Sequence, residues 1–362
     1  MKELTHYING QRVSGSSGRF GDVFNPATGE VQARVPLASK EEFDAAVEIA
    51  AKVQPEWGAV NPQRRARVMM KFVDLLHRDM DKLAEVLSSE HGKTFPDAKG
   101  DVQRGLEVAE YCIGAPQMLK GEFTDSAGPG IDMYSMKQPL GVCGGITPFN
   151  FPAMIPMWMF APSVVCGNAF ILKPSERDPS VPILLAELME EAGLPKGLLQ
   201  VINGDKVSVD AMLTNPTIQS IGFVGSTPIA EYIYGTGCAN GKRVQCFGGA
   251  KNHMIVMPDA DIEQASDALI GAAFGSAGER CMAISVAVAI GDSADKLIEN
   301  ITPKINNIKV GPYNDETTDY NNYDRYFSKF YKYDNSRLSR FTRQLERFLR
   351  NTEDLYSKLH PI

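Results

Sequence analysis

The chain has 362 residues, of which 43% are hydrophobic and 22% charged, with a formal net charge of -7 and a pI near 5.4. This composition is typical of a globular protein with two or more domains. The acidic balance argues against binding to nucleic acid or to an anionic membrane, because both polyanions need a basic protein face. The expected partner is therefore a small molecule.

The first ten residues contain neither the apolar core of a signal peptide nor an Arg-rich leader, which favours the cytoplasm. No apolar run approaches the ~18 residues of a membrane helix. The six cysteines include no CxxC pair and no histidine at ligand spacing. The sequence therefore predicts neither a membrane span, nor a zinc site, nor a disulfide framework.

The N-terminal part of the chain has helical patterning. Ser39-Lys40-Glu41-Glu42 is a capping box, and Phe43, Ala46, Val47 and Ala50 follow it at helical spacing. Pro62 suits the first turn of a second helix, and apolar faces continue until Gly92. Residues 119–136 are Gly-rich and weakly patterned, which predicts a hairpin arm for contacts between subunits.

Short apolar runs alternate with helical stretches from about residue 139 onward. The runs are 141–146, 169–172, 199–202 and 218–224. Because they are apolar on consecutive positions, they predict parallel strands covered on both faces, in a doubly wound α/β sheet. A second α/β unit is expected from about Val244, with a strand at 254–257, a helix at 261–277 and a strand at 284–290.

A cysteine follows a glycine turn in Phe274-Gly275-Ser276-Ala277-Gly278-Glu279-Arg280-Cys281. The bend can present the sulfur at a cleft, and Arg280 can favour the thiolate that attacks an aldehyde. Cys281 is thus a candidate nucleophile. A buried structural cysteine is the commoner outcome for an isolated cysteine, so the alternative stays open at this point.

Pro148-Phe149-Asn150-Phe151-Pro152 follows a predicted buried strand, which places Asn150 on a rigid loop at the carboxyl edge of the sheet. Its side-chain amide and the backbone N–H of Cys281 can donate to the oxyanion formed by thiolate attack. Removing such a donor typically costs ~3 kcal/mol. An asparagine that only braces its loop would give the same pattern.

Two further strand ends carry residues suited to a nucleotide. In Leu172-Lys173-Pro174-Ser175-Glu176-Arg177, Lys173 and Glu176 can hold ribose hydroxyls, although a solvated charge cluster is the alternative. Phe223-Val224-Gly225-Ser226-Thr227 predicts a strand-to-helix junction suited to a pyrophosphate. The usual GxGxxG fingerprint is missing.

These four motifs, in this order and spacing, resemble the aldehyde dehydrogenase superfamily over residues 1 to about 320. Gly248-Gly249-Ala250-Lys251-Asn252-His253 and Gly278-Glu279-Arg280-Cys281-Met282-Ala283 are similar to its CoA-acylating methylmalonate-semialdehyde dehydrogenase branch. The resemblance implies oxidation of malonate or methylmalonate semialdehyde with NAD, through a thioester on Cys281, to acetyl-CoA or propionyl-CoA. It also implies a homo-oligomer.

The resemblance assigns further roles. Arg104 and Arg280 match arginines that grip the substrate carboxylate, a task that suits the planar guanidinium, although Arg104 could equally be a surface helix residue. Hydrolytic members carry a glutamate base before the Gly-Gly pair, at the position of Cys246, and its absence here favours coenzyme A as acyl acceptor. The residues implied around NAD are Thr147, Phe149, Lys173, Glu176, Arg177, Ser226 and Gly248.

The resemblance also divides the chain into an NAD-binding domain (1–245), the N-terminal part of a catalytic domain (246–320) and a tail (321–362) that matches nothing in the family. A truncation, frameshift or fusion would explain the join. The tail has nine basic against five acidic residues. Its apolar residues predict a basic amphipathic helix, docked on its own domain or binding a partner. They are Leu338, Phe341, Leu345, Phe348 and Leu349.

Three other hypotheses remain open. The first is a hydrolytic NAD-dependent aldehyde dehydrogenase, and the second is an inactive fragment that retains NAD binding. The third, a cysteine hydrolase, is disfavoured because no histidine lies at a persuasive position near Cys281 in the sequence.

Overall fold

The computed structural model describes residues 2–321, so the predicted helix of the tail lies outside the described residues. The chain forms two compact units. Within the described residues, the first comprises residues 2–25, Glu30–His91 and Phe95–Gly248, and the second comprises Pro26–Gly29, Gly92–Thr94 and residues 249–321.

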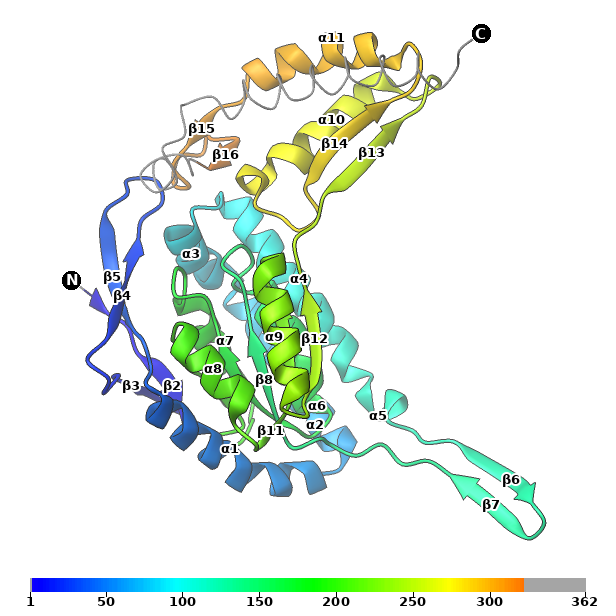
Figure 1. Ribbon diagram of the computed structural model, residues 1–362. Coiled ribbons are helices and arrows are strands. Elements are labelled where there is room, and N and C mark those ends of the chain that lie inside the picture. Colours follow the sequence, from blue (N-terminus) through cyan, green and yellow to red (C-terminus); the bar gives the residue numbers. More distant parts are fainter. Residues whose placement is uncertain (1, 322–362) are drawn as a thin grey trace. The chain divides into compact units, whose positions relative to one another are not determined.

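A seven-stranded sheet forms the centre of the first unit (Figure 1). Its strands are β2 (His6–Ile8), β3 (Gln11–Val13), β8 (Val142–Ile146), β9 (Ala169–Lys173), β10 (Leu199–Val201), β11 (Ile218–Val224) and β12 (Arg243–Phe247). They lie in the order β12-β11-β8-β9-β10-β2-β3, parallel from β12 to β10 and antiparallel beyond. The predicted doubly wound α/β class is confirmed, and the predicted domain boundary after residue 245 falls inside β12.

Strand β8 is packed tightly on both faces because it contains two consecutive glycines. A Cβ on Gly144 would lie 2.7 Å from the sulfur of Met212, and one on Gly145 would lie 2.6 Å from the ring of Phe170. Successive side chains of a strand point to opposite faces. Neither face of the sheet therefore has room for a residue larger than glycine at positions 144 and 145.

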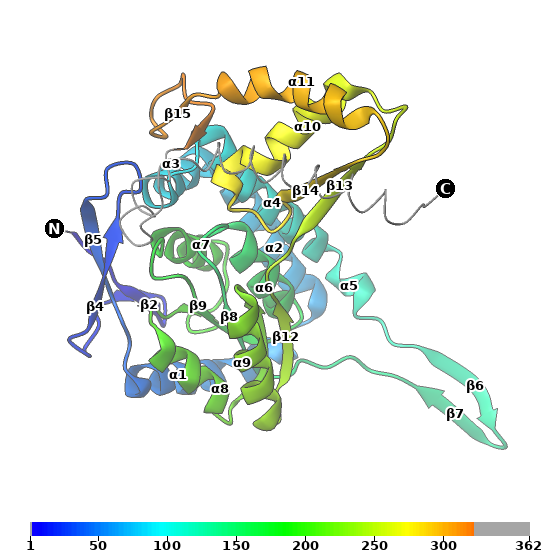
Figure 2. The same ribbon diagram turned by 45° about the horizontal axis from the view of Figure 1, so that its top comes forward.

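Helices cover both faces of this sheet. On one face lie α6 (Met154–Val165) and α7 (Ser180–Glu191), and on the other lie α1 (Lys40–Ala59), α8 (Lys206–Thr214) and α9 (Thr227–Ala239). Figure 2 shows α1, α8 and α9 side by side. The predicted capping box at Ser39 is confirmed, because its hydroxyl accepts from the backbone N–H of Glu42.

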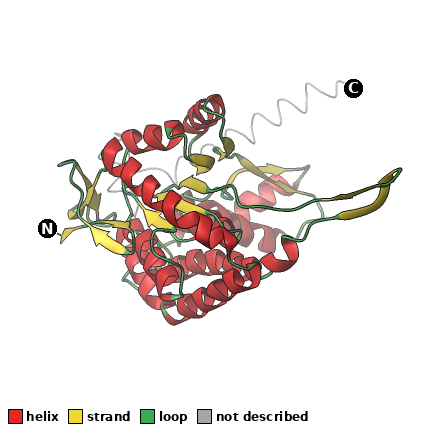
Figure 3. Ribbon diagram, turned by 90° about the horizontal axis from the view of Figure 1, so that it is seen from below, coloured by secondary structure: helices red, strands yellow, loops and turns green. Residues whose placement is uncertain are grey.

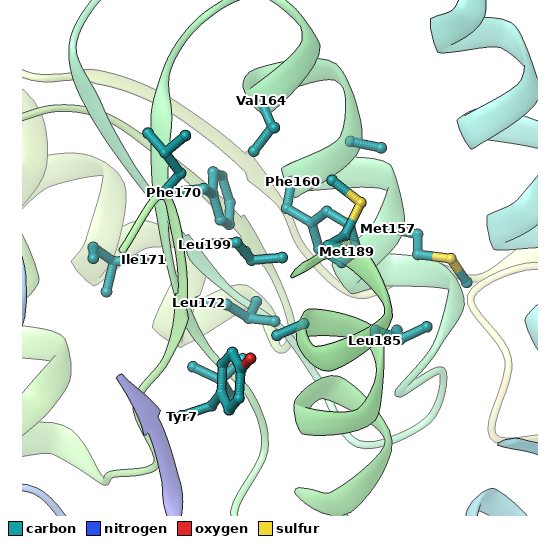
Figure 4. Close-up of a cluster of buried hydrophobic side chains, with 14 of the residues drawn as sticks. Tyr7, Met157, Phe160, Val164, Phe170, Ile171, Leu172, Leu185, Met189 and Leu199 are labelled. Carbon is teal, nitrogen blue, oxygen red and sulfur yellow. The ribbon is translucent and has the colours of Figure 1, made fainter. Parts of the chain in front are cut away.

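The core of the first unit extends over both faces of the sheet, and one part of it lies between the sheet and the helices α6 and α7. Figure 4 shows Phe170 and Leu172 of β9 directed toward these helices, whereas Ile171 points the other way. Burial of this much apolar surface is the main stabilising contribution to a fold of this size. The buried helix residues in this view include Met157, Phe160, Val164, Leu185 and Met189.

An outer layer of helices packs on α6 and α7. It consists of α2 (Pro62–Arg78), α3 (Met80–His91) and α4 (Phe95–Ile113), and the short α5 (Ala115–Met118) packs beside α2 and α4. Pro62 lies in the first turn of α2, as predicted. A Cβ on Gly105 of α4 would lie 2.1 Å from the terminal carbon of Met157, so this glycine allows α4 to approach α6 closely.

Two smaller β structures complete the first unit. The strands β1 (Lys2–Glu3), β5 (Val31–Pro36) and β4 (Phe20–Phe24) form a separate sheet. The predicted arm at 119–136 contains a hairpin of β6 (Phe123–Gly128) and β7 (Ile131–Tyr134), which extends away from the rest of the first unit (Figures 1 and 3). Its role in subunit contacts stays a prediction.

The second unit is a smaller α/β structure. The parallel strands β13 (Asn252–Val256) and β14 (Ile284–Ala289) pair with each other, and α10 (Ile262–Phe274) and α11 (Ser293–Asn306) pack beside them. The predicted order of strand, helix and strand is confirmed. The short elements are η1 (Gly275–Gly278), β15 (Val310–Gly311) and β16 (Tyr320–Asn321). The buried hydrophobic residues in the described part of this unit are Val256, Leu269, Ala287, Leu297, Ile301 and Ile305.

A search of residues 2–321 finds no helix that is both long enough and apolar enough to cross a bilayer.

Candidate active site

The carboxyl ends of the parallel strands meet at one edge of the sheet. Ile146 of β8 lies opposite Lys173 of β9 on one side and opposite Phe223 of β11 on the other. From β8 the chain adds β9 and β10 outward, then returns to the far side for β11 and β12. Ligands of open α/β sheets bind at such a reversal point. The loops after β8 and β11 therefore flank the expected crevice.

Thr147 is the first residue after β8. Its backbone N–H donates to the carbonyl of Lys173 across 3.2 Å, which continues the pairing of β8 and β9 by one residue. Its side-chain hydroxyl is buried and has no hydrogen-bond partner within the described part of the chain. Buried hydroxyls in native proteins are nearly always bonded. The Thr147 hydroxyl is thus a group that a bound ligand can satisfy.

Lys173 and Glu176 form an ion pair at the end of β9. The Lys173 side chain is only 7% exposed, whereas that of Glu176 is 47% exposed, and their charged atoms lie 3.4 Å apart. A buried ammonium and a solvent-facing carboxylate offer a donor and an acceptor side by side. That combination suits the vicinal hydroxyls of a ribose. The burial of Lys173 disagrees with the alternative of a solvated charge cluster.

Phe149 lies in the loop between β8 and α6. The guanidinium carbon of Arg177 lies 4.8 Å from the centroid of its ring, in a cation–π arrangement. The structure thus brings together two of the residues expected around NAD. The ring of His91 also stacks on Phe149, with centroids 6.2 Å apart. Sequence reasoning missed His91, because no local pattern indicates a contact between residues so far apart.

Asn150 follows Phe149 in the same loop and is partly buried. The loop is fixed at its far end, where the backbone N–H of Met154 donates to the Asp101 carboxylate across 2.7 Å. Asp101 lies on α4 and is buried. The amide of Asn150 is therefore carried by a loop that is anchored to a neighbouring helix.

Ser226 and Gly248 lie where β11 and β12 end. Ser226 is the N-cap of α9, is exposed, and makes no capping hydrogen bond through its side chain. A Cβ on Gly248 would lie 2.9 Å from the Thr227 hydroxyl and 3.3 Å from its Cα. The glycine lets the end of β12 approach the first turn of α9. Backbone N–H groups at a helix start attract phosphate oxygens.

Arg104 lies on α4 with an exposed side chain. Its carbonyl accepts a hydrogen bond from the indole N–H of Trp158, across 3.1 Å. This contact ties α4 to α6, the helix that follows the Asn150 loop. The exposure agrees both with a substrate ligand and with a surface residue, so the role of Arg104 stays a prediction.

Cys281 and Arg280 belong to the second unit. Cys281 is exposed and follows a left-handed turn in which Ser276, Ala277 and Gly278 have φ values of 53°, 52° and 76°. The Asn252 side-chain amide donates to the Cys281 carbonyl across 2.8 Å and to that of Ala283 across 3.0 Å. Non-glycine residues seldom adopt this conformation, which concentrates at functional sites. The exposed sulfur differs from a buried structural cysteine.

Gly275 shapes the approach of Arg280 to this turn. A Cβ on Gly275 would lie 2.6 Å from a terminal nitrogen of Arg280, so the guanidinium packs directly on the glycine backbone. Any larger residue at 275 would displace it. The arginine charge is therefore held against the turn that precedes Cys281.

The residues before Gly248 include position 246, where the family resemblance places a glutamate base in hydrolytic members. Cys246 is partly buried in β12, and burial, with a smaller effect from the charge of Cys238, raises the pKa of its thiol. The next residue is Phe247, so neither position supplies a carboxylate. A search of residues 2–321 also finds no group of His, Cys, Asp and Glu side chains arranged for a metal ion.

The profile of the aldehyde dehydrogenase family matches residues 13–323, and the chain belongs to this family. Among its relatives is the malonate-semialdehyde dehydrogenase of Pseudomonas aeruginosa, 54% identical over 312 residues. That alignment covers 86% of this chain and 63% of the relative. Malonate-semialdehyde dehydrogenase 2 of Geobacillus thermodenitrificans is 49% identical over 310 residues. Its alignment covers 86% of this chain and 64% of that relative.

Two solved structures are similar over the same region. A Sinorhizobium meliloti protein assigned as a methylmalonate-semialdehyde dehydrogenase, solved in complex with NAD, is 66% identical with a TM-score of 0.87. The methylmalonate-semialdehyde dehydrogenase of Oceanimonas doudoroffii is 52% identical with the same TM-score. They cover 88% and 89% of this chain, and the chain covers 65% and 66% of theirs. This chain therefore spans less than two thirds of the length of each of these four relatives.

Proposed function

We propose that the protein oxidises malonate or methylmalonate semialdehyde with NAD and transfers the acyl group to coenzyme A. The observation that carries the cofactor assignment is a set of three features at the sheet edge. They are the buried Thr147 hydroxyl without a partner, the Lys173–Glu176 pair, and the close approach of Gly248 to the start of α9. These residues fit a dinucleotide, with phosphates at α9 and a ribose at the ion pair.

The chemistry proposed for the chain begins at Cys281. Its thiolate adds to the aldehyde carbon, and the Asn150 amide with the Cys281 backbone N–H donates to the resulting oxyanion. When bound, NAD supplies the hydride acceptor for this oxidation. The product on the protein is a thioester at Cys281. Arg104 and Arg280 bind the substrate carboxylate by charge-assisted hydrogen bonds.

The acyl acceptor follows from the residues before Gly248. Neither the thiol of Cys246 nor Phe247 can act as a carboxylate base that activates water. A thioester without such a base persists until a better nucleophile arrives, and the thiol of coenzyme A is one. Loss of carbon dioxide, which would leave an acetyl or propionyl group, rests on the family resemblance alone.

The test is the appearance of NADH with methylmalonate semialdehyde and NAD, with and without coenzyme A. We expect CoA-dependent turnover that Cys281→Ala abolishes, a loss of at least about 10³-fold because the nucleophile is removed. Cys238→Ala is the matched control, since Cys238 is also an exposed cysteine but lies on α9 outside the proposed site. Turnover that survives in Cys281→Ala would refute the nucleophile, and turnover without coenzyme A would favour hydrolysis.

A second candidate is nucleotide binding without turnover. Every residue expected around NAD lies in the first unit, at one edge of its sheet. This unit has a large hydrophobic core of its own, which favours nucleotide binding without the second unit. NAD binding by a folded sample that produces no NADH would support this alternative.

A further inference from the structure

The end of helix α3 contacts the loop that carries Asn150. The ring of His91, the last residue of α3, stacks on the ring of Phe149 with an interplanar angle of 24°. His91 is almost completely buried. Aromatic pairs at this separation contribute attraction that depends on ring orientation, so the contact favours one placement of Phe149.

Phe149 is held by a second side chain as well. The Arg177 guanidinium lies over its ring, and Arg177 belongs to the segment that follows β9. The far end of the same loop is fixed by Asp101, which accepts from the Met154 backbone N–H. Contacts from α3, from the segment after β9 and from α4 thus converge on the residues either side of Asn150.

The residue before His91 binds the other strand-to-helix connection at this edge. The Glu90 carboxylate accepts from the backbone N–H of Ser180 across 2.9 Å and from its hydroxyl across 2.5 Å. Ser180 begins α7, whose N-cap residue, Pro179, makes no side-chain capping bond. Two consecutive residues of α3 therefore contact the connections that follow β8 and β9.

We propose that His91 is a positioning residue, which fixes Phe149 by ring stacking and thereby sets the orientation of the adjacent Asn150 amide and of the cofactor-side loop. This inference rests on the proposed function, which assigns this loop to the oxyanion and to NAD. The stacking itself is a property of the protein without ligands, and its effect on loop order can be measured without substrate.

The test compares four variants by amide hydrogen exchange in residues 147–153. His91→Gln keeps a polar side chain and removes the ring, whereas His91→Phe keeps a ring and removes polarity. His91→Ala removes both. Leu87→Ala is the matched control for a cavity, because Leu87 is fully buried on α3 one turn earlier.

We expect His91→Gln and His91→Ala to speed exchange in this loop by roughly three- to tenfold, the range that an aromatic pair accounts for. His91→Phe and Leu87→Ala should match the wild-type chain in the same residues. The proposal is overturned if His91→Gln leaves exchange unchanged, if His91→Phe speeds it equally, or if Leu87→Ala loosens the loop as much.

A titration with NAD separates this inference from the proposed function. If the wild-type chain binds NAD, His91→Gln should weaken the affinity by roughly three- to tenfold and His91→Phe should retain it. If the folded wild-type chain binds no NAD, the proposed cofactor assignment fails. The exchange measurements still decide whether His91 orders the loop.

Discussion

The two units differ in the size of the sheet and the hydrophobic core that support the residues proposed for the site. In the first unit, the residues around the sheet edge are backed by a seven-stranded sheet with helices on both faces and a single large core. In the described part of the second unit, the turn before Cys281 is supported by the strands β13 and β14, the helices α10 and α11, and six buried hydrophobic residues. The small unit also leaves large apolar side chains exposed, including Ile255, Met257 and Met282.

This difference indicates that the residues at the sheet edge and the turn before Cys281 differ in how much loss of packing they tolerate. Small cores bury too little surface to offset much loss of packing. The sheet edge proposed for the cofactor should therefore persist under conditions in which the turn before Cys281, the proposed nucleophile, is lost.

The largest effect is expected from Leu269→Ala. Leu269 is fully buried in α10 and belongs to the small core of the second unit. Its truncation should cost about 2–5 kcal/mol in that unit. Hydrogen exchange should then show unprotected amides in residues 252–305, while β8 and β9 stay protected.

The matched variant is Leu172→Ala, which truncates an equally buried leucine of β9 in the first unit. Because the large core surrounds it, the first unit should lose stability and remain folded at 25 °C. A single transition, lowered equally by both variants, would contradict the comparison.

A smaller and pH-dependent effect is expected at Glu90 in the first unit. Burial, partly offset by the hydrogen bonds from Ser180, raises the pKa of Glu90 from its ordinary value of 4.5 to about 7. Between these values the folded state binds more protons than the unfolded state. The contribution to stability is therefore fully present below pH 4.5 and is lost as the pH rises through 7.

Glu90→Gln cannot ionise and should escape this loss. Its free energy of unfolding should exceed that of the wild-type chain by roughly 1–3 kcal/mol at pH 8 and equal it near pH 4. Thermal unfolding across this pH range measures the difference. A difference that does not vary with pH would show that ionisation of Glu90 has no part in it.

The sequence predicted those elements whose signals are local. The strands β8 and β9 are buried along their whole length, which agrees with the apolar runs that predicted them, and α1 was marked by its capping box. The order of these strands also placed Thr147 and Lys173 at the same sheet edge. Their neighbouring positions follow from the parallel pairing of β8 with β9.

Features that depend on distant contacts were not predicted. The N-terminal strand β2 joins the sheet through the pairing of Tyr7 with Val201, and its three residues carry no clear alternation. Strand β12 alternates between exposed and partly buried residues at the sheet edge, so the predicted domain boundary cut through it. The positive φ of Ser276 and Ala277 has no sequence signal either, because neither residue is glycine.

The binding of NAD to the wild-type chain, measured by calorimetric titration beside Lys173→Gln and Cys281→Ala, bears on all of these assignments. The proposed site predicts binding by the wild-type chain, equal binding by Cys281→Ala, and an affinity lowered by roughly 10- to 100-fold in Lys173→Gln, since a charged hydrogen bond is removed. Absence of binding in a folded wild-type sample, or unchanged affinity in Lys173→Gln, would contradict the assignment of this sheet edge to the cofactor.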